Sequence, residues 1–500
     1  MEFDADVIVV GAGPSGAMIA SEIALTGARV IVLERRTGPV ESRAGTLLPR
    51  VLEIFDSRGI ADRFIARMSE ISAYPFRPTH IYAGLKFVQW QNIGSRFGFT
   101  LGLPQNHTEE LLLSWAIENG ADVRDGHAFT GLRQDDDGVE AEFMRSSGDI
   151  IKLRAHYLVG ADGGRSTVRH ALGLNFTGHS GTFTGIVADA EITAPWSAGH
   201  FGTDNTRGWL RGFGFGEGIT RFNMVHRQSM KCGKDEPVTV EEIRRNLEEI
   251  AGEDFGVRSL RWTSRYDDTM RCVERLRSGR VFLVGESARI HYPASGVGMN
   301  FCLQDAFNLG WKLGMVVRGE AAESLLDSYQ SERMPVIERL LDSVRAQVAV
   351  QFNFSEEGQA LKRTLEDEHL PGATLNRRLG LELNGIEKPY FFKDGQHQLA
   401  GLPAPDLDLV LPDGTVTRIG ELLRRQQFLL LDLTGQMEID TPDEWADRIR
   451  FVKAIASRRG ENTASVQAML IRPDAYVAWA SDQPVRPDAW DWQDVCCGMI

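Results

Sequence analysis

Two short apolar runs, separated by glycines and a helix, open the chain. The run Ala5–Val10 is rich in Val and Ile, as buried parallel strands are, and it leads into Gly11-Ala-Gly13-Pro-Ser-Gly16. Helix-forming residues Ala17–Leu25 follow, Gly27 ends them, and Arg29–Leu33 is a second apolar run. The pattern predicts a strand, a glycine turn, a helix and a strand within about 30 residues.

Farther along the chain, apolar periodicity predicts further helices and strands. Helices are expected at Glu109–Asn119, Thr239–Ile250, Gln304–Val317 and Glu320–Gln347, and strands at Tyr157–Ala161 and Arg280–Val284. Alternation around the turn Asp136-Asp137-Gly138 predicts a hairpin sheet that ends near Ala155. Apart from its one helix, Gly178–Thr263 is rich in glycine and in strand-forming residues, so we expect a separate sheet there.

The last part of the chain is predicted as a small α/β unit. Pro-Gly, Asn-Gly and Asp-Gly pairs in Glu366–Gly401 predict a linker, and a boundary is expected near residue 385. Strands are predicted at Phe428–Leu433 and Ala468–Ile471, with a helix at Glu444–Ala456 between them. The expected units are a discontinuous first domain (1–177 and 264–345), a β-rich domain (178–263), linker helices (346–385) and the α/β unit (386–500).

Charge and composition narrow the functional classes. With 55 basic and 69 acidic side chains, the net charge of −14 disfavours nucleic acid and anionic membranes as partners. Apolar residues make up 42%, enough for a buried core, and no apolar run reaches the ~18 residues of a membrane helix. Acidic residues precede Val7–Ala20, where a signal peptide carries basic ones, and the five cysteines form no CxxC pair. This cysteine usage is typical of a reducing compartment, so we expect a cytoplasmic protein. No metal-ligand spacing stands out, so no metal site is expected.

The glycine turn has the context of a dinucleotide-binding site. It follows a strand and opens a helix, and Glu34 ends the second strand 18 residues after Gly16. Gly11, Gly13 and Gly16 permit a tight turn that brings backbone N–H groups to a pyrophosphate at the positive end of the helix. A carboxylate at Glu34 accepts hydrogen bonds from ribose hydroxyls, which favours FAD or NAD over a 2′-phosphorylated dinucleotide.

Two later segments favour FAD over NAD as the bound dinucleotide. Asp162-Gly163 follows one predicted strand, and Gly285-Glu286 follows another. The second leads into Pro293–Asn300 and then a helix, and a glycine-rich segment at a helix N-terminus stabilises the edge of a flavin that becomes anionic on reduction. We therefore expect FAD to lie against a set of backbone and side-chain groups that also includes Glu286, Gly296, Gly298, Met299 and Asn300.

Over most of the first 345 residues, this order of motifs resembles the single-component (class A) flavoprotein monooxygenases of the p-hydroxybenzoate hydroxylase-like fold. The resemblance implies an α/β protein in which a Rossmann-like FAD-binding domain carries an inserted β-sheet substrate domain. It also implies that Arg43 and Gln105 line the FAD. Asp162 and Gly163 would lie at the FAD and help NAD(P)H to approach.

The C-terminal unit extends the resemblance. Ala404-Pro405-Asp406 and Arg472-Pro473-Asp474-Ala-Tyr476-Val-Ala-Trp479 resemble the thioredoxin-like extension of aromatic polyketide and phenol hydroxylases. Because this unit has no CxxC, a dithiol redox role is excluded and a packing or dimerisation role is expected; Cys496 and Cys497 are expected as free thiols. A monomer and a homodimer both remain open.

The activity implied by the family is that of an FAD-dependent, NAD(P)H-consuming monooxygenase in antibiotic biosynthesis. It would hydroxylate, or oxidise in the Baeyer–Villiger manner, a polycyclic aromatic polyketide through a flavin C4a-hydroperoxide formed with O2. Tyr292, Pro293 and Ser295 are expected at the reacting centre. Candidate contacts of a planar substrate are Trp209, Arg211, Phe222, Arg289 and His291. The alternation from Trp209 to Phe215 describes one face of an ordinary strand equally well.

Three positions depart from the family pattern. Glu286 replaces an Asp, Arg289 replaces a His, and Ser295 replaces a glycine that lets the backbone approach the flavin ring. These departures leave two alternatives open besides oxygenation. One is a flavoenzyme that oxidises, reduces or rearranges such a substrate without inserting oxygen, and the other is a non-catalytic flavin-binding scaffold.

Overall fold

The computed structural model describes residues 3–38, 42, 44–193, 200–215, 218–387, 390, 397–436, 448–457 and 461–483. Its largest sheet has the order β18-β19-β10-β1-β2-β7, and β9 and β8 continue it from β10. These strands are β1 (Ala5–Val10), β2 (Val30–Leu33), β7 (Asp122–Arg124), β8 (His127–Gln134), β9 (Val139–Arg145), β10 (Ile150–Gly160), β18 (Arg277–Ser278) and β19 (Val281–Leu283). β1 pairs in parallel with β2 and β10, and β10 pairs in parallel with β19. Since parallel strands end at one edge of a sheet, the three predicted motifs meet there.

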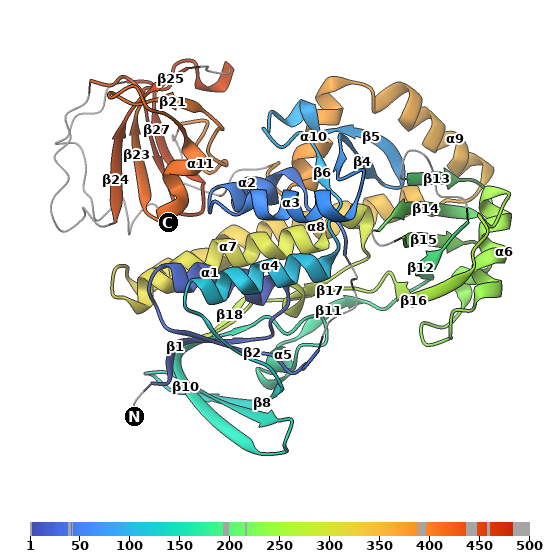
Figure 1. The fold of residues 1–500 in the computed structure, drawn as a ribbon, viewed down its shortest axis with the longest axis horizontal. Helices are drawn as coiled ribbons and strands as arrows, with labels where there is room; N and C mark the ends of the chain where they lie inside the picture. Colours follow the sequence, from blue (N-terminus) through green and yellow to red (C-terminus); the bar gives the residue numbers. More distant parts are fainter. Residues whose placement is uncertain are drawn as a thin grey trace.

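Helices α1 (Pro14–Leu25), α4 (Gln105–Glu118) and α7 (Gly298–Val317) lie side by side along this sheet (Figure 1). Nearly all of α1 and α7 is buried, because α1 packs between α4 and α7. α8 (Asp327–Gln351) follows α7 through a short turn of helix at Glu323–Leu326. None of the helices in the described ranges is long and apolar enough to cross a membrane.

A second, antiparallel sheet has the order β13-β14-β15-β12-β16. Its strands are β12 (Thr184–Glu191), β13 (His200–Asp204), β14 (Gly208–Gly214), β15 (Thr220–His226) and β16 (Ser259–Asp267). α6 (Val240–Ala251) covers one face, and its apolar side packs on Leu210, Phe222 and Met224. Figure 1 shows this sheet and the C-terminal unit on opposite sides of α7 and α8.

Smaller elements connect these layers. They are α2 (Pro49–Asp56), α3 (Ala61–Ile71), β3 (Phe76–Arg77), β4 (Thr79–Tyr82), β5 (Leu85–Gln89), β6 (Thr100–Leu101), α5 (Thr167–Ala171), β11 (Phe176–His179), β17 (Met270–Val273), β20 (Arg289–Ile290), α9 (Glu356–Thr364) and α10 (Ala373–Leu383). β3 pairs with β6, β4 pairs with β5, and β17 lies between β11 and β20. Hydrogen bonds from Thr46 to the Gly296 oxygen and from the Leu48 N–H to Asn300 join the segment between β2 and α4 to the start of α7.

The C-terminal unit contains a four-stranded sheet of order β24-β23-β26-β27 and a three-stranded sheet of order β22-β21-β25. The elements are β21 (Asp408–Val410), β22 (Val416–Arg418), α11 (Ile419–Leu422), β23 (Phe428–Asp432), β24 (Ile449–Lys453), β25 (Ile455–Ala456), β26 (Ala468–Ile471) and β27 (Val477–Ser481). Cys496 and Cys497 lie outside the described residues.

Most expected elements are present, and the exceptions have physical reasons. The helix predicted at Glu444–Ala456 is wrong for its described part, because Ile449–Lys453 is strand β24, paired in parallel with β23. The second long helix begins at Asp327 rather than Glu320. Within the predicted linker, α10 packs Leu379 and Leu383 into the main core, and the glycine and Asn-Gly signals mark its two ends.

A buried charge network runs along α7 towards the C-terminal unit. Glu332 of α8 accepts hydrogen bonds from Arg472 (2.5 and 2.9 Å), Asn308 (2.6 Å) and Lys312 (2.8 Å). Burial raises the pKa of Glu332, but Arg472 and Lys312 outweigh it and hold that pKa well below its usual value. Burial also lowers the pKa of Lys312 to about 8. The C-terminal unit therefore supplies the main counter-charge to a buried carboxylate of the first domain.

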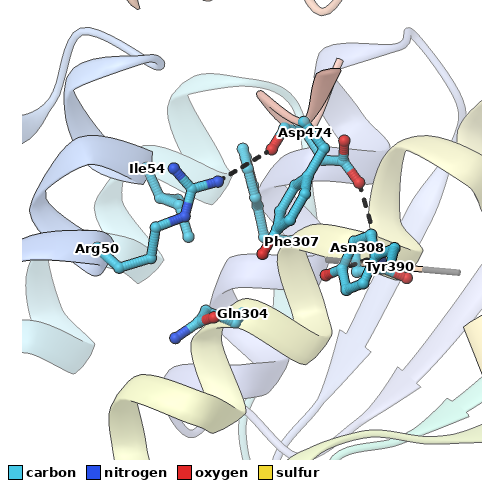
Figure 2. A pocket seen from close by; sticks show the side chains of 8 residues that line it. Arg50, Ile54, Gln304, Phe307, Asn308, Tyr390 and Asp474 are labelled. Atoms are coloured by element: carbon cyan, nitrogen blue, oxygen red, sulfur yellow. Dashed lines mark hydrogen bonds between the residues drawn. The ribbon is translucent and has the colours of Figure 1, made fainter. Parts of the chain in front are cut away.

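A small pocket beside this network has no room for a water-sized molecule, and Figure 2 shows side chains that line it, among them Arg50, Asn308, Tyr390 and Asp474. Arg50 Nη2 donates to the backbone oxygen of Asp474 across it (3.4 Å). Pockets for drug-sized ligands measure about 300–1,000 Å³. This pocket is therefore a packing gap at the joint with the C-terminal unit.

Replacing Glu332 by Gln should lower the free energy of unfolding by about 3–5 kcal/mol, because it leaves Arg472 and Lys312 buried without their carboxylate. The matched control is Asp342→Asn on the same helix, whose ion pair with Arg345 is exposed (53% and 68%). The control should change the free energy by about 0.5 kcal/mol or less. Urea unfolding of both variants measures the difference, and equal effects would contradict the role of the network.

Candidate active site

The three glycines of the first turn have different surroundings. Gly11 has a φ of +100°, and a Cβ there would lie 2.6 Å from the backbone oxygen of Ala161. A Cβ at Gly16 would lie 1.9 Å from the backbone oxygen of Gly11, whereas a Cβ at Gly13 would meet nothing within 4 Å. The first and third glycines therefore permit close packing, and the second faces open space at the N-terminus of α1. This is the cradle that a dinucleotide pyrophosphate requires.

Glu34 is held beside this turn. Its Oε2 accepts a hydrogen bond from the Ala12 N–H (2.9 Å), and its Oε1 accepts one from Arg36 Nε (2.7 Å). Burial raises the pKa of Glu34, but these bonds outweigh it and leave the pKa below its usual value. An ionised carboxylate therefore lies next to the open side of the turn. Arg36 was not expected, although a cation two residues after the acid is a visible signal.

The Asp-Gly and Gly-Glu segments, more than 100 residues apart, lie together. Ser287 Oγ donates to the Gly160 oxygen (2.6 Å). Arg169 donates to the backbone oxygens of Ser287 (2.8 Å) and Gly164 (3.0 Å). Arg169, which sequence reasoning missed, therefore bridges the two segments. Glu286 lies exposed at the end of its segment.

Asp162 has one satisfied and one unsatisfied oxygen. Oδ2 accepts hydrogen bonds from the N–H groups of Thr167 (2.7 Å) and Val168 (3.1 Å) at the start of α5, and Ser166 caps the same helix as expected. Oδ1 is buried, and it has no hydrogen-bond partner among the described residues. Beside it, Gly163 has open space at its Cβ position. Asp162 Oδ1 can therefore accept a hydrogen bond from a ligand that carries hydroxyl groups, such as the ribityl chain of FAD.

Gln105 fixes the chain around Arg43. Its Oε1 accepts a hydrogen bond from the Ala44 N–H (3.1 Å), and its backbone N–H donates to Ser42 Oγ (2.7 Å). Arg43 itself lies outside the described residues, so its contact with FAD remains a prediction.

The start of α7 holds the other end of the same segment. Asn300 Oδ1 accepts from the Leu48 N–H (2.8 Å), and Thr46 Oγ1 donates to the Gly296 oxygen (3.0 Å). Met299 is buried next to Asn300. Asn300 and Gly296, both expected at the flavin, are therefore in direct contact with the segment that follows Arg43.

Ser295 occupies a backbone conformation that favours glycine. Its φ is +51°, which costs a residue with a side chain roughly 1 kcal/mol. Two contacts hold it there: Ser295 Oγ donates to Gln347 Oε1 (2.7 Å), and His80 Nε2 donates to the Ser295 oxygen (2.7 Å). The serine hydroxyl thus bonds to α8. Neither His80 nor Gln347 was expected, because each lies more than 50 residues away along the chain.

A directional chain of hydrogen bonds sets the state of His80. Trp90 Nε1 donates to Thr100 Oγ1 (2.8 Å), and Thr100 Oγ1 donates to His80 Nδ1 (3.0 Å). With Nδ1 accepting and Nε2 donating to Ser295, the ring is neutral. Burial, together with the positive charge of Arg77, lowers the pKa of His80 to about 4 although the Ser295 bond raises it. His80 is therefore a fixed neutral donor at neutral pH.

The residues expected at the reacting centre lie at the turn before α7. Tyr292 is buried among the rings of Tyr266, Phe183 and Phe352, and burial raises its pKa well above the usual value. Pro293 is exposed, so its ring is open to a ligand. Gly298 begins α7.

Arg289 and His291, two of the candidate substrate contacts, do not offer a free positive charge to a ligand such as a phenolate. Arg289 is 1% exposed, and its guanidinium forms an ion pair with Asp305. Burial lowers the pKa of His291 to about 4, and its Nδ1 donates to the Tyr292 oxygen (2.7 Å). Their contact with a phenolate stays a prediction, but the geometry gives Arg289 the role of a counter-ion.

The predicted substrate residues of the inserted sheet lie on two different faces. Trp209 belongs to the main core and touches Phe352 of the segment after α8, and Arg211 stacks on Trp209. Phe222 pairs with Gly212 and points to the opposite face, where it packs on Phe255 under α6. The prediction that Phe222 shares a face with Trp209 and Arg211 was wrong. Successive residues of a strand point to opposite faces, so Gly212 and its partner Phe222 lie on the face opposite to Trp209 and Arg211.

Comparisons with known proteins agree with this site. A family model described as an FAD binding domain matches residues 4–344, and one described as the C-terminal domain of aromatic-ring hydroxylases matches residues 397–493. The chain belongs to the FAD-dependent aromatic-ring hydroxylases. The recognition, the fold class and FAD as the cofactor are thereby confirmed.

Three relatives show the range of this family. The chain is 38% identical to a rifampicin monooxygenase of Streptomyces venezuelae, over 97% of this chain and 98% of the relative. The structure of OxyS anhydrotetracycline hydroxylase from Streptomyces rimosus superposes with a TM-score of 0.82 at 35% identity, over 95% of both chains. A dialkyldecalin synthase of Streptomyces rugosporus is 32% identical over 95% of this chain and 96% of the relative.

Gly13→Val should give a folded protein that does not retain FAD, because the added side chain fills the only one of the three glycine positions with open space. The control is Gly131→Val in β8, where a Cβ also meets nothing within 4 Å. Flavin absorbance of the purified proteins and their thermal unfolding test this. A yellow Gly13→Val protein would contradict the placement of the pyrophosphate.

His80→Gln should reduce the acid sensitivity of the protein, since Gln keeps one donor and one acceptor but does not titrate. In the native protein the pKa of His80 is about 4, below the ~6.5 of an unfolded histidine. The unfolded state therefore binds more protons below about pH 6.5, so stability is full above that pH and falls as the pH decreases towards 4. Thermal unfolding from pH 7.5 to 4.5 should fall less steeply in the variant. His291 is present in both proteins, so equal slopes would contradict the assignment.

Proposed function

We propose that this protein is an FAD-dependent monooxygenase that uses NAD(P)H and O2 to hydroxylate, or to oxidise in the Baeyer–Villiger manner, a polycyclic aromatic polyketide. The observation that carries this proposal is the meeting of the glycine turn, the Asp-Gly segment and the Gly-Glu segment at one edge of the parallel sheet, in a chain of this family. Relatives named for rifampicin and anhydrotetracycline, both multi-ring polyketides, support the substrate class.

The chain offers each part of FAD a matching group. The N–H groups at the start of α1 would hold the pyrophosphate, Glu34 a ribose, and Asp162 Oδ1 a hydroxyl. The positive N-terminus of α7, a helix of 20 residues, would stabilise negative charge on the flavin. When bound, FAD accepts a hydride from NAD(P)H and activates dioxygen, of which one atom is transferred to the substrate.

The protein's own part in the reaction is to hold the flavin and keep water away. The turn that precedes α7, from Tyr292 to Gly296, is called the flavin turn below. The rings of Tyr292, Tyr266, Phe183 and Phe352 form a contiguous aromatic wall next to it. Such a wall protects a reactive oxygen species from water. Ser295, clamped between His80 and Gln347, fixes the backbone where the ring of the cofactor is expected.

Chemistry without oxygen insertion is the second candidate. Its support is the relative named dialkyldecalin synthase, which is 32% identical to this chain over 96% of its own length. Because Ser295 and Arg289 are accommodated by contacts inside the protein, these departures do not themselves favour this candidate over oxygenation.

Two further properties belong to the proposal. We place the protein in the cytoplasm, in line with its cysteines that form no CxxC pair, and we expect a monomer or a homodimer. Size-exclusion chromatography with light scattering distinguishes the two assemblies.

The test is turnover of anhydrotetracycline and of a hydroxyanthraquinone with NADPH under ¹⁸O2. Monooxygenation predicts one ¹⁸O atom per product and consumption of one NADPH per product. Product without ¹⁸O would support the second candidate instead. A protein that holds FAD but neither oxidises NADPH nor forms product with either compound would contradict both enzymatic proposals.

A further inference from the structure

We propose that Arg77 selects an ionised substrate, by binding the phenolate or enolate oxygen of the polycyclic ring that is to be oxygenated. The inference rests on the proposed function, and it assigns to that site a substrate class, anionic polycyclic phenols and enols. It also assigns a specificity-determining residue that the sequence did not single out.

Arg77 lacks the partner that enclosed arginines elsewhere in the protein have. It ends β3 and is only partly exposed, yet within the described ranges its guanidinium forms neither a hydrogen bond nor an ion pair. Burial lowers its pKa to about 10, so it remains cationic at neutral pH. By contrast, Arg221 pairs with Asp189, Arg265 pairs with Glu242, and Arg333 pairs with Asp305. A desolvated cation without a counter-charge is unfavourable unless a ligand supplies the anion.

The surroundings of the Arg77 guanidinium suit a flat aromatic ligand. Its Cζ lies 4.9 Å from the ring centre of Phe213, which is on the same face of β14 as Trp209 and Arg211. A Cβ at Gly102 would lie 3.2 Å from Arg77 Nη2, so the glycine leaves room for the guanidinium. Arg77 thus stands between the inserted sheet and the segment leading to Gln105.

Arg77 is also close to the turn that is expected to line the flavin. Its charge contributes to the lowered pKa of His80, and His80 donates to the Ser295 oxygen (2.7 Å). A ligand that contacts the guanidinium would therefore lie between the aromatic face of β14 and this turn. The proposal places the ring that is to be oxygenated at this position.

The other cations near this face are already engaged. Arg211 donates to the backbone oxygens of Thr203, Leu210 and Gly84. Arg221 forms a two-point ion pair with Asp189 (2.6 and 2.7 Å). Of these three guanidinium groups, that of Arg77 is the one without a hydrogen-bond acceptor among the described residues.

Binding of the anion has a direct chemical consequence. The phenol O–H bond breaks on ionisation and the proton passes to water, because an arginine cannot accept it. The guanidinium stabilises the resulting oxyanion and so lowers the pKa of the bound phenol. An ionised phenol is richer in electrons, and so reacts faster with an electrophilic oxygen.

The experiment titrates the dye alizarin, a dihydroxyanthraquinone whose absorption moves to longer wavelength on ionisation, bound to the FAD-containing protein. The native protein should lower the pKa of the bound dye by at least one unit. Arg77→Met should abolish this shift and weaken binding of the ionised dye roughly ten- to a hundredfold. Arg77→Lys should keep part of the shift, because it retains the charge but not the planar fork.

Arg227→Met is the matched control, since Arg227 lies exposed at the turn after β15 and is expected to leave the titration unchanged. FAD content and NADPH oxidation are measured in every variant, so a failure of the proposed function is visible separately. If native holoprotein that oxidises NADPH does not bind alizarin, or if the bound dye titrates alike in the native and Arg77→Met proteins, the inference is overturned. Equal loss in Arg227→Met would also overturn it.

Discussion

The buried carboxylate of Asp305 is the contact on which the geometry of the flavin turn depends. It lies on α7, is fully buried, and forms ion pairs with Arg289 and with Arg333 Nε (2.8 Å). Arg289 immediately precedes the turn that contains Tyr292, Ser295 and Gly296, and Arg333 belongs to α8. A buried charge tolerates little displacement of its partners, because removing one leaves the others unpaired in a medium of low polarity. The carboxylate therefore fixes the start of the turn relative to both long helices.

The same network explains why a thioredoxin-like unit without a dithiol is present. Arg333 also donates to the Tyr390 hydroxyl (3.2 Å), and the preceding residue, Glu332, binds Arg472, which is paired in turn with Asp474. The motif Arg472-Pro473-Asp474 therefore completes the charge balance of α7 and α8 rather than performing redox chemistry. Since α7 begins in the flavin turn, the C-terminal unit supports the site from a distance. These contacts agree with a packing role, one of the two roles (packing or dimerisation) that the missing CxxC implied.

What the sequence could predict was decided by how far each contact reaches along the chain. The roles of Gly11, Gly13 and Gly16 follow from one turn, so they could be inferred in advance. His80, Gln347 and Arg169 could not, because their partners lie 215, 52 and 118 residues away. Phe222 was grouped wrongly because a list of aromatic residues ignores the alternation of faces along a strand. The helix expected at Glu444–Ala456 fails for a similar reason, because Ile449, Phe451 and Val452 suit a strand added to an existing sheet.

The three departures from the family pattern do little to weaken the proposal that this protein inserts oxygen into its substrate. Arg289 brings a charge, and Asp305 neutralises it inside the core. Ser295 brings a strained backbone, and Gln347 and His80 hold it from two sides. Glu286 is exposed, where an additional methylene group meets no dense packing. Each change is therefore absorbed by residues behind the flavin turn, and the space on its substrate side is set by other groups. We therefore expect the difference between inserting oxygen and rearranging a ring to depend on residues of the proposed substrate face, such as Trp209, Phe213 and Arg77.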